Sequence, residues 1–391
     1  MNLILSIILF PIIAYLAIAG IYQLVLAISS QFTDNESFKP ANKQHKFLVL
    51  VPAYKEDAVI LESTKKNMAL KYEYHRDLFD YVVIADGLKA QTNQALMALG
   101  AKVHVVNFDK STKVKALQSA TNKYNSSYDA VVVLDADNVV NLSFLRKASL
   151  YLSQGYCAIQ GQRMAANSQS VMAILDGFSE TANNAMLCKG ANKLGLSSKL
   201  SGSGMVFTYA LFKSAVDQLE AIGGFDKEME LMLTSRQVYI KYAHDLIVED
   251  EKVAAYEDYA KQRGRWLEAQ YNFLRKEIKP SLKALIKGNR DYFHKTLQLA
   301  LPPRALAPFA MLLCVLPAYQ ISSILLTMAL TGFLSNMGSY LITIPKGPLF
   351  KHSWAIFKAL PALVKSTLKA LAWMKRSRTE FLHTSHSLVE S

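Results

Sequence analysis

Cysteine is scarce in this sequence of 391 residues, where it occurs only as Cys157, Cys188 and Cys314. Three scattered cysteines are too few for a disulfide framework or a structural zinc site, and we expect neither. Acidic residues are also fewer than basic ones. The sequence has 31 Asp and Glu and 44 Lys and Arg, which gives a formal net charge of +13. This excess suits an anionic partner, and nucleic acid, phospholipid headgroups and nucleotide phosphates all qualify.

Charged side chains are missing altogether from residues 1–33. Within this stretch the apolar run Leu3–Ile28 is long enough to cross a bilayer core of about 30 Å as a helix. A signal peptide would have a basic start and a small-residue cleavage site, and neither is evident. Lys39, Lys43 and Lys46 follow, and by the positive-inside tendency they place the next domain in the cytoplasm. We therefore expect a transmembrane helix in residues 1–33.

A second stretch without charge covers residues 305–345, enough for two crossings packed as a hairpin with both ends cytoplasmic. Leu316–Ser323 and the vicinity of Gly332 are the candidate turns. Apolar residues then recur at helical spacing between lysines from Ser353 to Met374, which predicts an amphipathic helix at the membrane interface. Lipid bilayer is thus the expected anionic partner, and nucleic acid is not. We assign the hairpin to residues 301–345 and the interfacial helix with its tail to residues 351–391, which gives three crossings in a multi-pass protein of the cell membrane.

Between these ends, short apolar runs alternate with helix-length segments from Lys46 onward. Strands separated by helices in this way predict an α/β fold with a mostly parallel sheet and helices on both faces. Ligands of such sheets bind beyond the carboxyl ends of the strands. The predicted strands are Phe47–Val51, Tyr81–Ala85, Val103–Val106 and Ala130–Leu134, and the predicted helical segments open at Glu56, span Ala90–Leu99 and span Lys113–Tyr124.

Polar residues follow three of these strands, at the edge where a ligand is expected. Tyr54 is suited to stack on a base, or it is an ordinary packing aromatic, and Asp86 with Gly87 is by itself typical of a turn. Lys113 and Lys115, at the head of a predicted helix, are candidates to reach phosphates, or they form a solvated face. The candidates at the strand ends are Pro52, Ala53, Tyr54 and Glu56 after the first strand, Asp86 and Gly87 after the second, and Asp135 and Asp137 after the fourth.

Asp135 and Asp137 carry the most specific chemistry among these residues. In an extended backbone their side chains point to one face while Ala136 points away. Two neighbouring carboxylates repel each other unless a cation or a shared proton relieves the charge. Mg²⁺ or Mn²⁺ suits oxygen ligands and keeps positions open for phosphates. Taken alone, the pair is equally compatible with a solvated turn.

Later segments carry further polar candidates. Gln160–Arg163 and Asn167 follow a predicted strand at Tyr156–Ile159, and the small residues Ser201–Gly204 are typical of a tight turn or a close approach to a ligand. Arginine in the Gln262–Trp266 segment suits diphosphate oxygens, although an amphipathic helix on the membrane is the alternative. Glycines at 223 and 224 lead into Asp226, Glu228 and Glu230, which are helix-capping acids or chemically active ones.

The order of these motifs resembles the membrane-bound family 2 glycosyltransferases, which include synthases of the cellulose, chitin and hyaluronan type and ceramide glucosyltransferases. The resemblance runs from about Lys46 to Trp266. It implies a GT-A-type, Rossmann-like nucleotide-sugar-binding domain flanked by transmembrane and interfacial helices. The cytoplasmic catalytic domain would then cover residues 44–250, and interfacial helices carrying the Gln262–Trp266 segment would cover residues 251–300.

The resemblance also implies roles for individual residues, position by position. Asp135 and Asp137 look like the Asp-X-Asp motif that holds Mg²⁺ or Mn²⁺ on the donor diphosphate. The other substrate-binding candidates that it implies are Pro52, Ala53, Tyr54 and Glu56 in a nucleotide-binding first loop, Asp86 with Gly87 at the base, Ser203 and Gly204 in the loop lining the acceptor, and Gln262, Arg265 and Trp266 in a Gln-X-X-Arg-Trp motif near the diphosphate and the acceptor. Lys115 is added as a phosphate-binding candidate from its place at the head of a predicted helix.

One departure concerns the catalytic base. The family usually has Glu-Asp before an apolar helical run, with the Asp as base, and here Lys227 and Glu228 occupy those positions. Glu228 is therefore the predicted base, and Asp226 or Glu230 serves if the register differs. The predicted activity is inverting transfer of a hexosyl or N-acetylhexosaminyl group from a nucleotide diphosphate sugar, expected to be UDP-linked. The predicted acceptor is lipid-linked or a polysaccharide. Arg265 and the metal are expected to neutralise the charge of the leaving diphosphate. The alternatives are a metal-dependent nucleotidyltransferase and a membrane-anchored nucleotide-sugar-binding protein with impaired catalysis.

Overall fold

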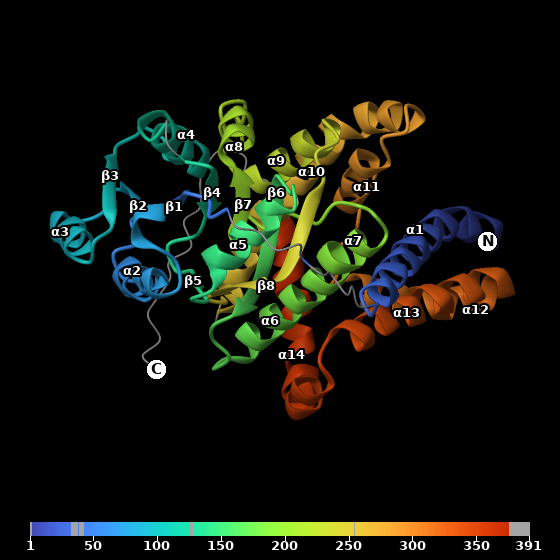
Figure 1. Ribbon diagram of the computed structural model, residues 1–391. Helices are drawn as coiled ribbons and strands as arrows, with labels where there is room; N and C mark the ends of the chain where they lie inside the picture. The colour runs from blue at the N-terminus through green and yellow to red at the C-terminus, as the bar shows by residue number, and fades with distance from the viewer. Residues whose placement is uncertain (1, 33–37, 39–42, 126–127, 254, 375–391) are drawn as a thin grey trace.

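A mixed eight-stranded sheet with helices on both faces forms the centre of the protein, which we describe from a computed structural model (Figure 1). The structure describes residues 2–32, 38, 43–125, 128–253 and 255–374, so the expectations for Lys39 and for the tail from residue 375 lie outside it. The strands are β1 Phe47–Tyr54, β2 Phe79–Asp86, β3 Lys102–Val106, β4 Ala130–Val133, β5 Val139–Val140, β6 Ala158–Ala165, β7 Met205–Thr208 and β8 Ile240–Asp250, in the spatial order β3-β2-β1-β4-β7-β6-β8-β5.

The helices fall into those that cover the sheet and those that extend from it. The first group is α2 Ile60–Asn67, α3 Ala90–Ala98, α4 Lys113–Lys123, α5 Phe144–Ser153, α6 Val171–Asn183, α7 Ala191–Lys193, α8 Tyr209–Val216 and α9 Phe225–Ser235, with 3₁₀ turns at Met68–Tyr72 and Arg76–Leu78 and a π-helical turn at Asn184–Gly190. The second group is α1 Asn2–Ser29, α10 Tyr256–Ile286, α11 Arg290–Leu299, α12 Ala307–Ile321, α13 Ser323–Thr343 and α14 Lys346–Trp373.

Strands β1 to β4 form the parallel part of the sheet that the sequence predicted. β1 pairs with β2 on one side and with β4 on the other, and both pairings are parallel. Successive side chains of β1 point to opposite faces. Val49 and Val51 therefore pack in a core that includes α2, α3 and α5, whereas Leu48 and Leu50 pack in a second core with α4, α8 and α9. Because both faces are covered, these strands read as continuous apolar runs.

Two strands run further than predicted. β1 continues through Pro52 and Ala53 to Tyr54, so these residues end a strand instead of forming a loop after it. Proline lacks a backbone N–H and is normally excluded from central strands. Pro52 is tolerated because the pairing of β1 with β4 already stops at Leu50. In the same way, Gln160–Arg163 lies inside β6 and not after it.

The far half of the sheet departs from the prediction. β7 lies antiparallel between β4 and β6, and β8, which is not among the predicted strands, pairs with β6 in parallel. Its apolar residues are interrupted by charged ones such as Lys241 and Asp245, so the run does not resemble a buried strand. β8 nevertheless extends the sheet, and β5, which closely follows Asp135 and Asp137 in the chain, pairs with it at the edge.

Three apolar helices, α1, α12 and α13, lie together at one end of the molecule (Figure 1). Two segments, Ile4–Ser29 and Ser323–Thr343, are long and apolar enough to span a membrane. α12 has 15 residues, fewer than the roughly 20 that a crossing requires. The extended residue Ser322 separates α12 from α13, within one of the two predicted turn regions. Near the other end of the pair, Tyr340 Oη donates to the carbonyl of Arg304 at 3.4 Å, which shows that α12 and α13 are antiparallel.

Candidate functional site

Asp135 and Asp137 lie where the chain leaves β4 in a turn. β4 ends at Val133, so the two acids lie beyond the strand, and Asp137 is in a turn. The Asn138 side chain accepts a hydrogen bond from the Asp135 amide at 2.9 Å, and the Asn138 amide donates to the Asp135 carbonyl at 3.1 Å. Both aspartates are partly exposed while Ala136 is buried. The two acids thus lie at a turn, with the Ala136 side chain buried between them, and this geometry is compatible with both a structural turn and a metal site.

The two aspartates have different partners. Asp137 accepts hydrogen bonds from Asn138 Nδ2 and from the Glu251 amide, both at 3.1 Å. Asp135 forms an ion pair with Lys113, whose ammonium also donates to the carbonyl of Gly202 at 2.8 Å. A lysine at the start of α4 thus connects the acidic turn to a second loop. We call Asp135, Asp137, Lys113 and Gly202 the acidic rim.

Lys113 belongs to the acidic rim, whereas Lys115, the predicted phosphate ligand, points away from it. The two residues are separated by about 200° around a helix, so their side chains leave on opposite sides. Lys115 is exposed, and its ammonium donates to the carbonyl of Lys110 at 2.9 Å.

The loop of residues 197–204 borders the acidic rim and is fixed by side chains from several elements. Gly202 and Gly204 have φ values of 81° and 63°, in the left-handed region that favours glycine. Ser203, predicted to line the acceptor, is fully buried in this loop. The loop is therefore held in place by protein contacts before any ligand binds. These contacts run from Asp291 to the Ser197 amide, from Glu230 to the Leu200 amide, from Gln160 to the Ser201 amide, from Arg163 to the Ser201 carbonyl and from Lys113 to the Gly202 carbonyl.

Three acids of α9 point in different directions. A Cβ atom placed on Gly202 would stand 3.8 Å from Asp226 Cβ, so Asp226 adjoins the acidic rim. Within the described part of the chain, the Asp226 carboxylate accepts no hydrogen bond. Glu230 is buried, and its carboxylate accepts the Leu200 amide at 2.5 Å.

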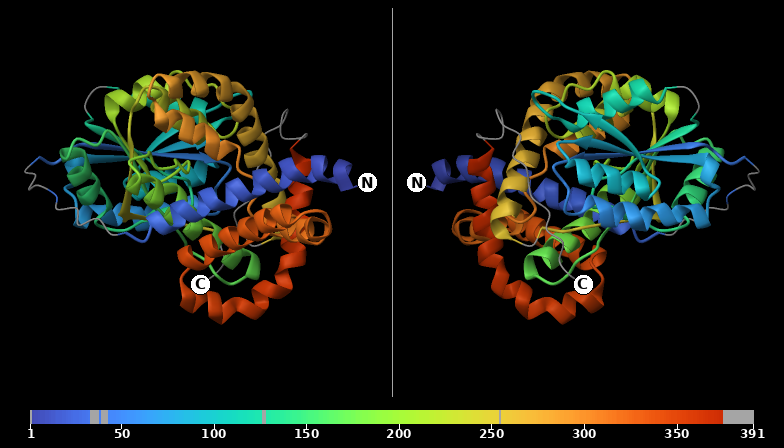
Figure 2. Two further views of the ribbon diagram at one scale, coloured as in Figure 1. Left: turned by 90° about the vertical axis from the view of Figure 1, so that its right-hand side faces the viewer. Right: turned by 90° about the vertical axis from the view of Figure 1, so that its left-hand side faces the viewer.

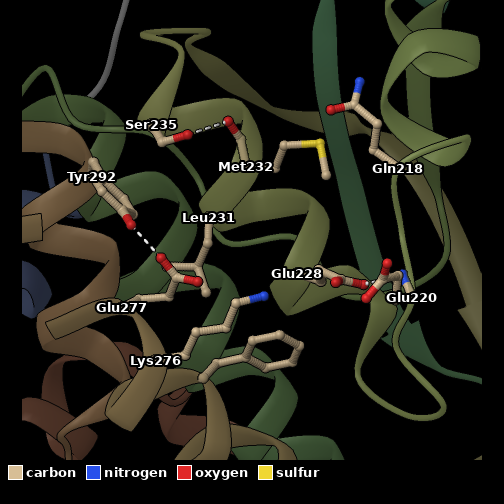
Figure 3. Close-up of a pocket in the computed structure, with 10 residues that line it drawn as sticks. Gln218, Glu220, Glu228, Leu231, Met232, Ser235, Lys276, Glu277 and Tyr292 are labelled. Atoms are coloured by element: carbon tan, nitrogen blue, oxygen red, sulfur yellow. Dashed lines mark hydrogen bonds between the residues drawn. The ribbon is translucent and has the colours of Figure 1, made fainter. Parts of the chain in front are cut away.

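Glu228, the predicted base, does not share this position. Its carboxylate accepts the backbone amides of Glu220 at 3.1 Å and Ala221 at 2.9 Å. Figure 3 shows Glu228 beside Glu220 in a cavity that Tyr292 and Glu277 also line. The side chain thus secures the loop before α9 on the side of the helix away from Asp226. The structure brings Asp226 to the acidic rim, whereas Glu228 binds the backbone of the loop before α9.

The predicted nucleotide-binding residues are brought together at the ends of β1 and β2. Tyr54 and Asp86 are direct partners in the parallel register. The chain then turns at Lys55, whose φ is 56°, and at Gly87, whose φ is 71°. The Lys55 amide donates to the Asp86 carbonyl at 3.0 Å, which joins the two turns. Glu56 follows and accepts the Ile60 amide through its carbonyl, so it begins the turn into α2.

Gln262, Arg265 and Trp266 lie on the first half of α10. Burial lowers the pKa of the Arg265 guanidinium below its ordinary value. The neighbouring Arg263 lies 4.4 Å from the centre of the Trp266 ring and donates to Asp176 at 2.6 Å. One turn further on, Ala269 packs on Gly224, where an added Cβ would stand 2.8 Å away. The helix carrying this motif therefore contacts the chain immediately before Asp226.

A buried ionic cluster lies next to the acidic rim and was not anticipated. Arg163 pairs with Asp250, and although burial opposes its charge, Asp250, Glu180 and Asp135 hold its pKa well above the ordinary value. Burial also opposes the charge of Glu180, but Lys252 and Arg163 lower its pKa to about 2. Arg163 thus links the cluster to Asp135. One sign of this cluster was present in the sequence, because Arg163 stands in a polar stretch that follows an apolar run.

The described residues contain no group of three or more His, Cys, Asp or Glu side chains placed to hold a metal ion. The acidic rim itself offers two carboxylates, Asp135 and Asp137. Mg²⁺ and Mn²⁺ are commonly held by one or two carboxylates, with substrate phosphates and water completing the shell. The donor set therefore fits a divalent cation whose remaining ligands come from a phosphate-bearing substrate.

A known protein family resembles this chain in sequence, and solved structures resemble it in fold. The family described as "Glycosyltransferase like family 2" matches residues 45–269, more than half of the chain. Among solved structures, a mannosyltransferase from Pyrobaculum calidifontis in complex with GDP-Man and Mn²⁺ is similar with a TM-score of 0.56 and 15% sequence identity, over 97% of this chain and 98% of that one. A glucosyl-3-phosphoglycerate synthase from Mycobacterium tuberculosis gives a TM-score of 0.42 and 18% identity, over 59% of this chain and 83% of that one. No curated protein matches the sequence.

Proposed function

The chain belongs to glycosyltransferase family 2, and we propose that it transfers a sugar from a nucleoside diphosphate sugar to a hydroxyl group of a lipid-linked or saccharide acceptor. The observation that carries this proposal is the position of Asp226 beside the acidic rim. Its carboxylate adjoins Gly202, whose carbonyl shares Lys113 with Asp135. A proton acceptor and a phosphate-binding edge thus meet at one loop.

Asp226 is the proposed general base in place of Glu228. A base must come within hydrogen-bond reach of the proton that it removes, and Glu228 is engaged with two backbone amides on the other side of α9. Asp226 takes the proton of the acceptor hydroxyl while the oxygen attacks the anomeric carbon. The bond from that carbon to the diphosphate oxygen breaks in the same step. A single displacement inverts the configuration, so an α-linked donor gives a β-glycoside.

The donor diphosphate lies, in this proposal, against Asp135, Asp137 and Arg265. Mg²⁺ or Mn²⁺ held by the two aspartates supplies positive charge that offsets the charge developing on the leaving group. Arg265 adds donors that match phosphate oxygens. Tyr54 and Asp86 bind the base. The sequence led us to expect a UDP-linked sugar, and the Pyrobaculum mannosyltransferase was solved with GDP-Man and Mn²⁺, so both nucleotides belong in the first assay.

We place the reaction at the cytoplasmic face of the cell membrane. α1 and α13 have the length and composition of membrane-spanning helices. The basic residues Lys43 and Lys46 follow α1 on the side of the catalytic domain, as the positive-inside tendency requires for a cytoplasmic domain. An acceptor presented at the bilayer surface would enter beside α10 and the loop of residues 197–204.

The test is nucleotide release by the purified full-length protein. UDP-glucose, UDP-galactose, UDP-N-acetylglucosamine and GDP-mannose are each supplied with a membrane lipid extract as acceptor source, in EDTA and with Mn²⁺ restored. We expect one donor to be turned over, with release of UDP or GDP that stops in EDTA and returns with Mn²⁺. Binding of a donor without any turnover, or release of pyrophosphate from a nucleoside triphosphate instead, contradicts the proposal.

A further inference from the structure

The C-terminal helix α14 has two unlike faces. Large apolar side chains are exposed along one side, at spacings of three, four and eleven residues that bring them to one stripe. Small residues are buried on the opposite side, at Ala359, Ser366 and Ala370. The exposed stripe consists of Phe350, Trp354, Phe357, Leu368 and Leu371, which are between 40% and 73% exposed.

The charge of α14 indicates what covers this stripe. Residues 346–373 contain five lysines and no acidic residue. Lys358 stands beside the stripe, with its ammonium 4.9 Å from the centre of the Trp354 ring, and Trp354 stacks on Phe357 at 5.9 Å. α14 also follows directly from α13, which is long and apolar enough to span a bilayer. An apolar stripe with aromatic and lysine neighbours at this place fits the surface of an anionic bilayer.

The small-residue face of α14 packs on α10, at the motif segment Gln262–Trp266. A Cβ atom on Gly264 would stand 2.7 Å from Trp373 Cβ and 3.0 Å from the Ala370 carbonyl, so only glycine permits this approach. Lys369 forms an ion pair with Glu257 in the first turn of α10. The curved course of α14, from the end of the apolar helices to α10, is visible in Figure 2.

We propose that α14 is a membrane-surface strap that couples bilayer contact to the position of the Gln262–Trp266 segment. Its exposed stripe and lysines bind an anionic bilayer. That contact holds Ala370 and Trp373 against Gly264, and so fixes Arg265 and Trp266 for donor and acceptor. The role given to Arg265 rests on the proposed function, whereas the bilayer contact does not depend on it.

The bilayer contact can be tested without any sugar donor. In full-length protein with the exposed Cys157 replaced by Ser, a single bimane-labelled cysteine is placed at Phe357, with Ile18 on α1 and Met97 on α3 as matched exposed sites. The proteins are reconstituted in phosphatidylcholine vesicles carrying nitroxide lipid, with or without phosphatidylglycerol. We expect quenching at positions 18 and 357, stronger at 357 with phosphatidylglycerol, and none at 97. Quenching at 18 without quenching at 357 overturns the proposal.

The coupling is tested with the double variant Trp354→Glu/Phe357→Glu and the control Met97→Glu. The three substituted side chains are exposed, so the unfolding temperature of each variant should match that of the wild type. In vesicles containing phosphatidylglycerol we expect the double variant to lose about fivefold or more in kcat, as for a coupling of the smallest usual size between two sites, and Met97→Glu to lose nothing. Unchanged kcat in a double variant whose stripe has left the membrane overturns the coupling.

Amide hydrogen exchange separates failure of this inference from failure of the proposed function. Exchange over residues 256–270 is compared in vesicles with and without phosphatidylglycerol, in the absence of donor. We expect phosphatidylglycerol to slow exchange in the wild type and to have no effect in Trp354→Glu/Phe357→Glu. Equal exchange in both lipids overturns the coupling even if the transferase activity is established, and slowed exchange supports it even if no donor is turned over.

Discussion

Asp226 and Glu228 point to opposite sides of α9, although only one residue separates them. Asp226 adjoins Gly202 at the acidic rim, and Glu228 accepts two backbone amides of the preceding loop. Because residues two apart on a helix are separated by about 200°, only one of the two can face a given site. The position of the first helical residue, Phe225, decides which one it is.

Removing Asp137 tests the role of the acidic rim in donor binding. Asp137→Ala leaves one carboxylate at the rim, so we expect the Mn²⁺ concentration for half-maximal nucleotide release to rise at least about tenfold, at the lower end of the losses caused by damage to metal sites. The matched control is Asp77→Ala, whose side chain is 87% exposed in a 3₁₀ turn away from the rim. Unchanged turnover in Asp137→Ala would contradict a metal site at Asp137.

The contact between α10 and the start of α9 can be tested with two adjacent glycines. Gly224 has a φ of 73°, and a Cβ atom there would stand 2.8 Å from Ala269 Cβ, whereas nothing lies within 4 Å of a Cβ on Gly223. Gly224→Ala should therefore lower the free energy of unfolding by at least about 1 kcal/mol, from backbone strain alone. Gly223→Ala should change it by less than about 0.5 kcal/mol. Equal effects, measured by denaturant unfolding in detergent, would contradict the close approach.

The buried His294 predicts a dependence of stability on pH. Burial, with the nearby charge of Lys295, lowers the pKa of His294 to about 3, and Tyr22 Oη lies 2.7 Å from its Nε2. The unfolded chain, with a histidine pKa of about 6.5, binds the proton first as pH falls, so stability is complete above pH 6.5 and is lost toward pH 3.

We expect the wild type to lose on the order of 2 kcal/mol between pH 7 and pH 5 through His294, at 1.36 kcal/mol per pKa unit. Unfolding of His294→Gln should lack this part of the pH dependence. The control His75→Gln changes a side chain that is 67% exposed and should keep the wild-type profile. Identical pH profiles for His294→Gln and the wild type would show that His294 does not titrate in this way.

The fold could be predicted from the sequence where burial on both faces left a simple signature. β1 to β4 are apolar runs separated by helices, and the predicted GT-A-type α/β fold with a mostly parallel sheet is confirmed. β8 was missed because Lys241 and Asp245 interrupt its apolar residues. Lys241 is nevertheless 7% exposed, with its ammonium 5.3 Å from the centre of the Tyr156 ring, a contact that no local pattern contains.

The sequence predicted where the candidate site lies, but not which side chains point into it. Tyr54 and Asp86 could be brought together because strand ends in a parallel sheet share one edge. The choices between Lys113 and Lys115, and between Asp226 and Glu228, depend on helix phase. α4 begins at Lys113 as predicted, but which side of it faces the acidic rim is set by tertiary packing, and so is the start of α9 at Phe225. Membrane crossings and the roles of Arg265 and Trp266 stay predictions.

Whether Asp226 is the base is measured most directly by comparing Asp226→Asn with Glu228→Gln in the nucleotide-release assay at saturating donor and Mn²⁺. We predict that Asp226→Asn lowers kcat by about 10²-fold to 10⁴-fold, as expected for loss of a general base, while the affinity for the donor is retained. Glu228→Gln should keep kcat within a few-fold of the wild type. A large loss in Glu228→Gln beside near-normal turnover in Asp226→Asn would contradict the account and return the role to Glu228.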